Sequence, residues 1–249
     1  MTDNSPRPDL SGKIALVTGA SRGIGYAMAL ALAKAGAHVL ALGRTVGGLE
    51  ELDDEINAAG GTASLIPADL NDEKAIAQLA PALADRYGKL DILIANAGAL
   101  GELAPIPDIS PDIWQRTFAT NVTANFQLFR TLDPLLRASD LPRVAVVTSR
   151  VGGAQARAFW GAYAASKAAL EMLAKTYALE TRSAGIRVSI IDPGAMRTKM
   201  RAQAMPGENP DTLPHPDELA PLLYHAVSRD YDGDADRLIF REWRAAGKI

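Results

Sequence analysis

A tyrosine and a lysine four positions apart are the side chains best suited to proton transfer. Tyr163 and Lys167 lie in the alanine-rich run Gly161–Lys167, which has the composition of a helix. Because positions i and i+4 share one helix face, the ammonium can sit beside the phenol. A tyrosine normally has a pKa of about 10, and an adjacent cation favours the phenolate, which brings the pKa towards the working range. We therefore expect an acid–base pair here.

A glycine-rich turn is the second feature. The run Thr18-Gly19-Ala20-Ser21-Arg22-Gly23-Ile24-Gly25 follows an apolar strand and precedes an apolar helix. Glycines let the backbone approach a pyrophosphate, and the helix N-terminus supplies free N–H groups and a positive dipole. The context predicts dinucleotide binding, and a tight turn chosen for packing is the alternative. The spacing G-x-x-x-G-x-G differs from the common G-x-G-x-x-G and indicates a subfamily.

The second strand ends in residues that bear on cofactor choice. Gly43-Arg44-Thr45 presents a cation where NAD enzymes usually carry an acid, and an arginine there accommodates the 2′-phosphate of NADP. Arg44, helped by Arg22, favours NADP(H) over NAD(H), unless both are solvated loop residues. Asp69, which ends the third strand, is expected to face the adenine. Its alternative role is the N-cap of a helix beginning at Asp72.

The elements that must position these residues alternate along the whole chain. Short β-rich apolar runs alternate with alanine-rich runs of helical period, which is typical of βαβ units. Several strands are almost entirely apolar, as in a parallel sheet covered on both faces. We predict an α/β fold, a Rossmann-type doubly wound parallel sheet. The expected strands are Lys13–Thr18, Ala37–Gly43, Thr62–Pro67, Leu90–Ala95, Arg143–Ser149, Ile186–Asp192 and Arg237–Arg241. The expected helices are Gly23–Ala35, Gly47–Ala59, Asp72–Tyr87, Ser110–Ala138, Gly161–Ala184 and Pro216–Arg229.

No linker or shift in composition divides the chain. We expect a flexible tail over residues 1–10 and a single domain over residues 11–249. The segment 194–214 is long and rich in methionine and proline, and is predicted to form a substrate loop or lid. Function should gather there and at the carboxyl ends of the strands.

Composition excludes several classes of protein. The 249 residues include 26 basic and 29 acidic side chains, a balance that argues against nucleic-acid binding. The absence of cysteine removes disulfides, thiolate nucleophiles and cysteine-based metal sites, and the three histidines are scattered, so no metal is expected. No apolar run approaches the roughly 20 residues that span a bilayer. The first ten residues show no signal peptide. A cytoplasmic protein with a small-molecule substrate is expected.

Together these residues resemble the short-chain dehydrogenase/reductase family, in family order and over most of the chain. The matching residues are Thr18–Gly25, Asp69, Asn96-Ala97-Gly98, Asn121, Ser149, Tyr163, Lys167, Pro193-Gly194 and Thr198. The resemblance implies hydride transfer between a nicotinamide and a carbonyl or secondary alcohol carbon. It also implies a homodimer or homotetramer.

The resemblance implies a role for each site residue. Tyr163 would donate a proton to the carbonyl oxygen, and Ser149 would hydrogen-bond that oxygen. Lys167 would lower the pKa of the tyrosine and hold the nicotinamide ribose, while Asn121 would position a water that relays protons. The implied cofactor-binding residues are Gly19, Ser21, Arg22, Gly23, Ile24, Gly25, Arg44, Asp69, Leu70, Asn96, Ala97, Gly98, Tyr163, Lys167, Pro193, Gly194 and Thr198.

The serine position is ambiguous in the sequence. The interval from Ser149 to Tyr163 is one residue longer than is usual in the family, so a strict count places Arg150 at the serine position. We favour an inserted residue in the loop Gly152–Ala158, because a loop tolerates an insertion more easily than a strand end does. Thr148 is a weaker substitute.

Other interpretations remain open. A dinucleotide-binding regulatory protein without turnover is one, although Tyr163, Lys167 and Asn121 together favour an enzyme. An isomerase or dehydratase would need a further acid or base. The C-terminal run Asp236–Trp243 lacks the family's usual Gly-Gly and is a departure from the family pattern.

Three groups of residues could serve either a site or simple packing. An aromatic pair with an arginine and three methionines could line a pocket or pack in the interior: Arg157, Phe159, Trp160, Met196, Met200 and Met205. A row of small or flexible side chains could form a dimer interface or be buried within the monomer: Ala165, Ala168, Ala169 and Met172.

Overall fold

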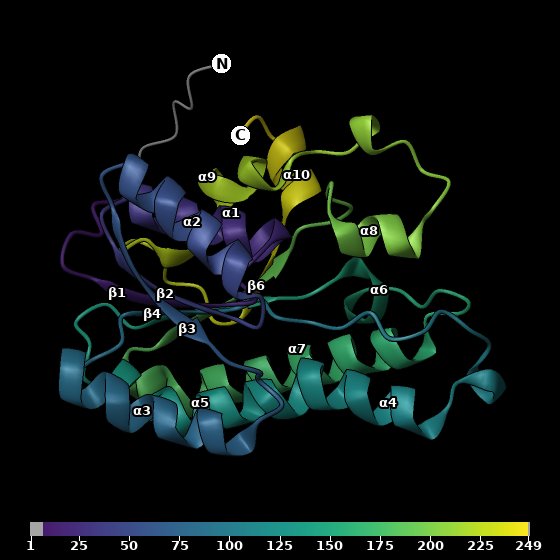
Figure 1. The fold of residues 1–249 in the computed structure, drawn as a ribbon, viewed down its shortest axis with the longest axis horizontal. Helices are drawn as coiled ribbons and strands as arrows, with labels where there is room; N and C mark the ends of the chain where they lie inside the picture. The colour runs from purple at the N-terminus through teal and green to yellow at the C-terminus, as the bar shows by residue number, and fades with distance from the viewer. Residues whose placement is uncertain (1–6, 249) are drawn as a thin grey trace.

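The computed structural model describes residues 7–248 and contains one parallel sheet (Figure 1). Its strand order is β3-β2-β1-β4-β5-β6-β7, and every neighbouring pair is parallel. The strands are β1 Ile14–Thr18, β2 His38–Gly43, β3 Thr62–Pro67, β4 Ile92–Ala95, β5 Arg143–Val147, β6 Arg187–Asp192 and β7 Asp236–Ile239. The predicted doubly wound fold is confirmed.

Helices cover both faces of the sheet, which explains why its central strands are apolar. Every residue of β4 and β5 is buried, because side chains on both sides of these strands meet helices. In Figure 1, α1, α2, α9 and α10 lie on one face and α3, α5 and α7 on the other. The helices are α1 Gly23–Lys34, α2 Val46–Ala58, α3 Glu73–Tyr87, α4 Pro111–Phe118, α5 Ala124–Arg137, α6 Arg150–Gly153, α7 Gly161–Thr181, α8 Lys199–Ala204, α9 Ala220–Val227 and α10 Phe240–Ala245.

The direction in which the chain winds reverses between β1 and β4. The two strands pair from Ala15↔Ile92 to Val17↔Ile94, although the chain leaves β1 towards β2 and leaves β4 towards β5. Beyond the pairing, the Thr18 hydroxyl accepts hydrogen bonds from the N–H groups of Asn96 and Ala97, each at 3.0 Å. Open α/β sheets bind ligands at such a switch point.

Two expected strands end earlier than predicted. The last strand was expected to reach Arg241, but β7 stops at Ile239, opposite Asp192 at the end of β6. With no neighbour to pair with beyond that point, the chain turns into α10 and buries Phe240 in the core. Likewise β5 ends at Val147, so Ser149 lies beyond the strand.

The long helix expected over residues 110–138 is continuous but not uniform. Between α4 and α5 the turn Ala119–Thr123 is a π-helix and carries Asn121. The segment 194–214 contains α8 and a 3-10 turn, Pro210–Thr212, instead of an extended loop.

The ends of the chain bear on two further expectations. Of the expected tail, residues 1–6 lie outside the described residues, whereas Leu10 is buried and its N–H donates to the carbonyl of Ala35 at 2.8 Å. The packed chain therefore begins before residue 11. None of the helices within residues 7–248 has the length and apolar character needed to cross a membrane.

Candidate active site

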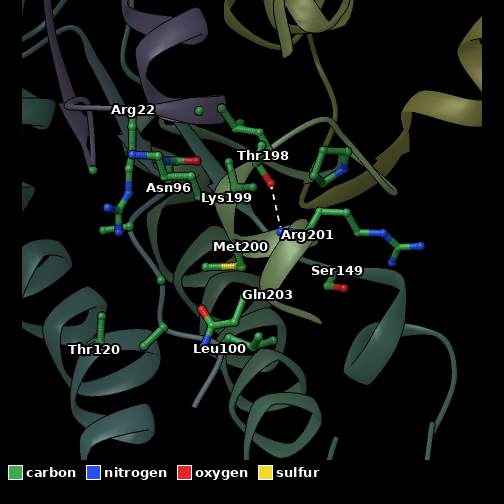
Figure 2. A pocket seen from close by; sticks show the side chains of 18 of the residues that line it. Arg22, Asn96, Leu100, Thr120, Ser149, Thr198, Lys199, Met200, Arg201 and Gln203 are labelled. Atoms are coloured by element: carbon green, nitrogen blue, oxygen red, sulfur yellow. Dashed lines mark hydrogen bonds between the residues drawn. The ribbon is translucent and has the colours of Figure 1, made fainter. Parts of the chain in front are cut away.

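A cavity of about 760 Å3 opens at the carboxyl ends of the strands. Loops from both halves of the sheet, the start of α7 and the inner face of α8 line it (Figure 2). All the predicted catalytic and cofactor-binding residues line this cavity except Gly25 and Asn121, which support its wall from behind. The fold therefore brings together residues that are separated by more than half the chain.

The glycine turn leaves the start of α1 free to hold an anion. The residue before the helix, Arg22, gives no side-chain cap, so the first N–H groups of the helix are not used by that side chain. A Cβ on Gly25 would overlap the Gly19 carbonyl and the Asn96 side chain, so only glycine fits there. Free N–H groups and close backbone approach suit a pyrophosphate.

The loops after β2 and β3 form the end of the cavity where the expected adenosine would lie. Arg44 Nη1 lies 3.8 Å from Asp69 Oδ2, and both side chains are partly exposed. Asp69 Oδ1 accepts the N–H of Asn71 at 3.0 Å, whereas Asp72 caps α3. The alternative role of Asp69 as the helix cap is therefore wrong. Leu70 joins Asp69 in the lining.

Tyr163 and Lys167 lie on the inward face of α7. The Lys167 ammonium is 5.9 Å from the centre of the Tyr163 ring and donates to the carbonyl of Val147 at 2.9 Å. Trp160 packs edge-on against the tyrosine, with 5.6 Å between ring centres. Both side chains line the cavity, and both are buried from bulk solvent.

Burial shifts the pKa values of both groups. It raises the pKa of Tyr163, while a hydrogen bond with Ser149 acts to lower it and the charge of Asp192 to raise it. Burial lowers the pKa of Lys167 to about 8, although the neighbouring Glu171 opposes this. Desolvation of the phenolate is the largest cause of the shift in Tyr163, so its pKa lies above the usual value in this structure, and the expected lowering of that pKa by Lys167 stays a prediction.

The structure distinguishes Ser149 from Thr148 and Arg150, its two neighbours in the sequence, by their surroundings. Ser149 lines the cavity, and its hydroxyl accepts the N–H of Val151 at 3.2 Å. Arg150 is exposed and is not part of the cavity wall formed by the described residues. Thr148 is buried, and its hydroxyl donates to Glu171 at 2.6 Å. The geometry favours Ser149 as the serine that faces a substrate.

Asn121 connects the loop after β4 to α7. Its Oδ1 accepts the N–H of Ala99 at 2.7 Å, and its Nδ2 donates to the Ala99 carbonyl at 2.9 Å and to Ser166 Oγ at 2.8 Å. The π-helical turn directs this side chain inward, a distortion frequent at functional sites. Ser166 in turn donates to the carbonyl of Tyr163 at 2.8 Å. The Asn121 amide group therefore donates to two partners within the protein and links the loop after β4 to α7.

Several apolar side chains line the cavity. Leu100, Trp160, Met196 and Met200 line it, with the amide of Gln203 among them. Figure 2 shows Gln203 projecting from α8 towards Leu100. Thr198 caps α8 by accepting the N–H of Arg201 at 3.2 Å. Arg201 also binds Glu208 through two bonds, of 2.5 and 2.6 Å, which hold the segment around α8 together.

Sequence reasoning overlooked two residues on α7. Ser166 follows Tyr163 by three positions, and Glu171 follows Lys167 by four. Both are polar yet buried. Their helical spacing from the acid–base pair was the signal that could have identified them.

Comparison with known proteins agrees with this geometry. The family model described as short chain dehydrogenase matches residues 13–209. The chain belongs to this family. One relative is the uncharacterised oxidoreductase YciK of Escherichia coli (strain K12). The two sequences are 40% identical over 229 residues, and the alignment covers 90% of each. The chain is accordingly an oxidoreductase of this family.

Two solved structures are also similar to this short-chain dehydrogenase. One, from Shigella flexneri 2a strain 301, was crystallised with NADP and has a TM-score of 0.90 with 37% identity, covering 95% of this chain and 100% of the other. Another, from Escherichia coli CFT073, was crystallised with NADPH and has a TM-score of 0.88 with 37% identity over the same shares.

Proposed function

We propose that this short-chain dehydrogenase is an NADP(H)-dependent carbonyl reductase or alcohol dehydrogenase. The observation that carries the proposal is the meeting of Ser149, Tyr163 and Lys167 in one cavity with the glycine turn. Related structures that hold NADP or NADPH support the cofactor. Arg44 and Arg22 in the lining support the choice of the phosphorylated form.

The residues that line the cavity would suit each part of a dinucleotide. The start of α1 would hold the pyrophosphate, while Asp69 and Leu70 would border the adenine. Asn96-Ala97-Gly98 would border the centre of the cofactor. The space there is kept by Gly98, where a Cβ would stand 3.3 Å from Asn121 Oδ1 and 3.4 Å from Lys167 Nζ. Pro193, Gly194 and Thr198 would border the nicotinamide end.

NADPH, when bound, supplies a hydride to the carbonyl carbon. Tyr163 donates its hydroxyl proton to the carbonyl oxygen, which becomes the alcohol oxygen. Its raised pKa keeps this proton in place until the oxygen gains negative charge. Ser149 donates a hydrogen bond to the same oxygen and stabilises that charge. Lys167 supplies a positive field beside the tyrosinate that forms, and Asn121 fixes the loop and helix that carry these groups.

The segment 194–214 is proposed as the substrate lid, since α8 within it lines the cavity through Lys199, Met200, Arg201, Gln203 and Ala204. A homodimer or homotetramer is also proposed. Ala168 and Met172 remain exposed on α7, and Ala165 and Ala169 are only half-buried, so the monomer does not bury this row. Phe126 on α5 and Leu179 on α7 are exposed by 48% and 66%. Light scattering at several concentrations tests this assembly.

The test of the enzyme is Tyr163→Phe, followed by NADPH absorbance against a panel of carbonyl compounds. The variant loses one hydroxyl and keeps the ring, so NADPH affinity should stay within a few fold. Turnover should fall by about 10² to 10⁴. Full activity in the variant would refute the mechanism. Tight NADPH binding by the unmodified chain without turnover of any compound would favour a binding protein.

A further inference from the structure

Arg237 joins three elements behind the acid–base pair. It lies on β7, next to β6 in the sheet. Its Nη1 donates to Glu171 Oε1 of α7 at 2.7 Å, and its Nη2 donates to Asp192 Oδ2 at the end of β6 at 2.8 Å. Nη2 also donates to the backbone carbonyl of Ser149 at 3.0 Å.

Each of these contacts leads to the cavity. The Ser149 carbonyl belongs to the residue whose hydroxyl faces the substrate. Asp192 accepts the N–H of Gly194 at 3.0 Å, at the turn that borders the nicotinamide end. Glu171 lies one helical turn after Lys167 and also accepts the hydroxyl of Thr148. One guanidinium therefore connects the serine, the lysine helix and the cofactor loop.

The network is buried and balanced in charge. The side chains of Glu171 and Asp192 are 5% and 3% exposed, and that of Arg237 is 18% exposed. When Lys167 is included, the buried region holds two cations, Lys167 and Arg237, and two carboxylates, Glu171 and Asp192. Buried ion pairs add little to stability once desolvation is counted, so stability alone is a poor reason for such an arrangement.

A glycine makes room for this contact. A Cβ on Gly153 of α6 would overlap both Glu171 Oε1 and Arg237 Nη1. The loop that follows Ser149 thus packs directly on the ion pair, and its path depends on the position of that pair.

We propose that Arg237 is a positioning residue that holds Ser149 in register and balances Glu171 and Asp192, and so sets the protonation of Tyr163 and Lys167. The inference rests on the proposed function for its effect on turnover. The charged side chains that act on the pair are Asp192 of β6, which acts on Tyr163, and Glu171 of α7, which acts on Lys167. Arg237 of β7 binds both of these carboxylates and so acts on the pair through them. Without Arg237, both carboxylates would act uncompensated and favour the protonated forms of the phenol and the amine.

The experiment measures NADPH affinity by calorimetry between pH 6 and 10, and the pH profile of alcohol oxidation for any substrate found. Arg237→Met should move the midpoint of each profile up by about one pH unit, because negative charge is unmasked. Glu171→Gln should move both midpoints down by about as much, because one carboxylate is removed while Arg237 remains. If the two variants merely destabilised the fold, their pH midpoints would not move in opposite directions.

Two further variants separate charge from geometry. Arg237→Lys keeps the charge but cannot donate to three partners at once, so the midpoints should stay in place while kcat falls about tenfold at unchanged KM. Arg143→Met removes another buried arginine, at the opposite end of β5, and should lower stability without moving a midpoint. If Arg237→Met does not fold, Glu171→Gln and Arg237→Lys carry the test.

The outcomes distinguish this inference from the proposed function. Absence of turnover in the unmodified chain would overturn the proposed function, while the NADPH-binding arm would still decide the role of Arg237. Midpoints within 0.2 pH units of the unmodified chain in both Arg237→Met and Glu171→Gln, or shifts of the same sign, would overturn the inference.

Discussion

Replacing Lys167 by methionine should stabilise the protein at neutral pH while abolishing turnover. Burial lowers the pKa of Lys167 from 10.5 to about 8, and each pKa unit corresponds to about 1.4 kcal/mol, so burying the charge costs about 3 kcal/mol of folding free energy. Methionine has similar length and no charge. It also loses the hydrogen bond to the Val147 carbonyl, worth about 1 kcal/mol. The net gain in the free energy of unfolding should be about 2 kcal/mol at pH 7.

The gain should depend on pH in a definite direction. The folded state releases the Lys167 proton near pH 8, whereas the unfolded state keeps it to about 10.5, so the unfolded state binds more protons in that window. The unmodified protein therefore becomes more stable as pH rises from 8 to 10.5, and Lys167→Met does not share this increase. The advantage of the variant should disappear at about pH 9.5 and reverse above it.

Urea unfolding at fixed protein concentration, repeated from pH 7 to 9.5, measures the difference. Lys175→Met is the matched control, since Lys175 lies on the same helix but is exposed. Its difference from the unmodified protein should stay flat with pH. A Lys167→Met protein less stable than the unmodified protein at pH 7, or a difference as flat as that of the control, would refute the reasoning.

Four other substitutions test the cavity and the serine position. Arg44→Asp removes a cation from the adenosine end and adds an acid, so calorimetry should show NADPH affinity falling by about 10- to 100-fold with NADH little changed; equal affinities of the unmodified protein for both cofactors would contradict this. Ser149→Ala should lower kcat by about 10² to 10³, whereas Arg150→Ala should leave it within a few fold. The opposite pattern in steady-state kinetics would assign the serine position to Arg150. Gly25→Ala forces a Cβ against the Gly19 carbonyl, so NADPH binding measured by fluorescence should weaken by at least about tenfold, and unchanged binding would show that the turn can adjust.

The order of strands and helices could be read from the sequence because it depends on local periodicity. Continuous apolar runs such as β4 and β5 indicate strands buried on both faces, and both strands were predicted, each two residues too long. The boundaries depended on partners far away. For example, β7 ends at Ile239 because β6, the strand with which it pairs, ends at Asp192. A period of 3.6 residues could not reveal the π-helical turn at Asn121, since one extra residue hardly alters the pattern.

The candidate site was predictable to the extent that its residues follow strand ends or share a helix face. Ser149, Tyr163 and Lys167 meet in the cavity for that reason. The sign of the tyrosine pKa shift was not predictable, because it depends on how much water the folded wall excludes. Arg237 could not be recognised either, since its partners lie 45 and 66 positions away in the sequence.

The contact between Gly153, Glu171, Asp192 and Arg237 has a consequence for how such sequences diverge. Loss of one carboxylate or of the guanidinium leaves a buried charge without its counterpart, and any side chain at position 153 collides with the pair. The effects of substitutions at these four positions are therefore not additive. During evolution, a sequence that loses one member of the set before the others would carry an unpaired buried charge or a steric clash. Relatives should accordingly carry either the whole set or a jointly altered one. Among distant relatives, this four-residue signature would mark a subgroup even where the substrate loops have diverged.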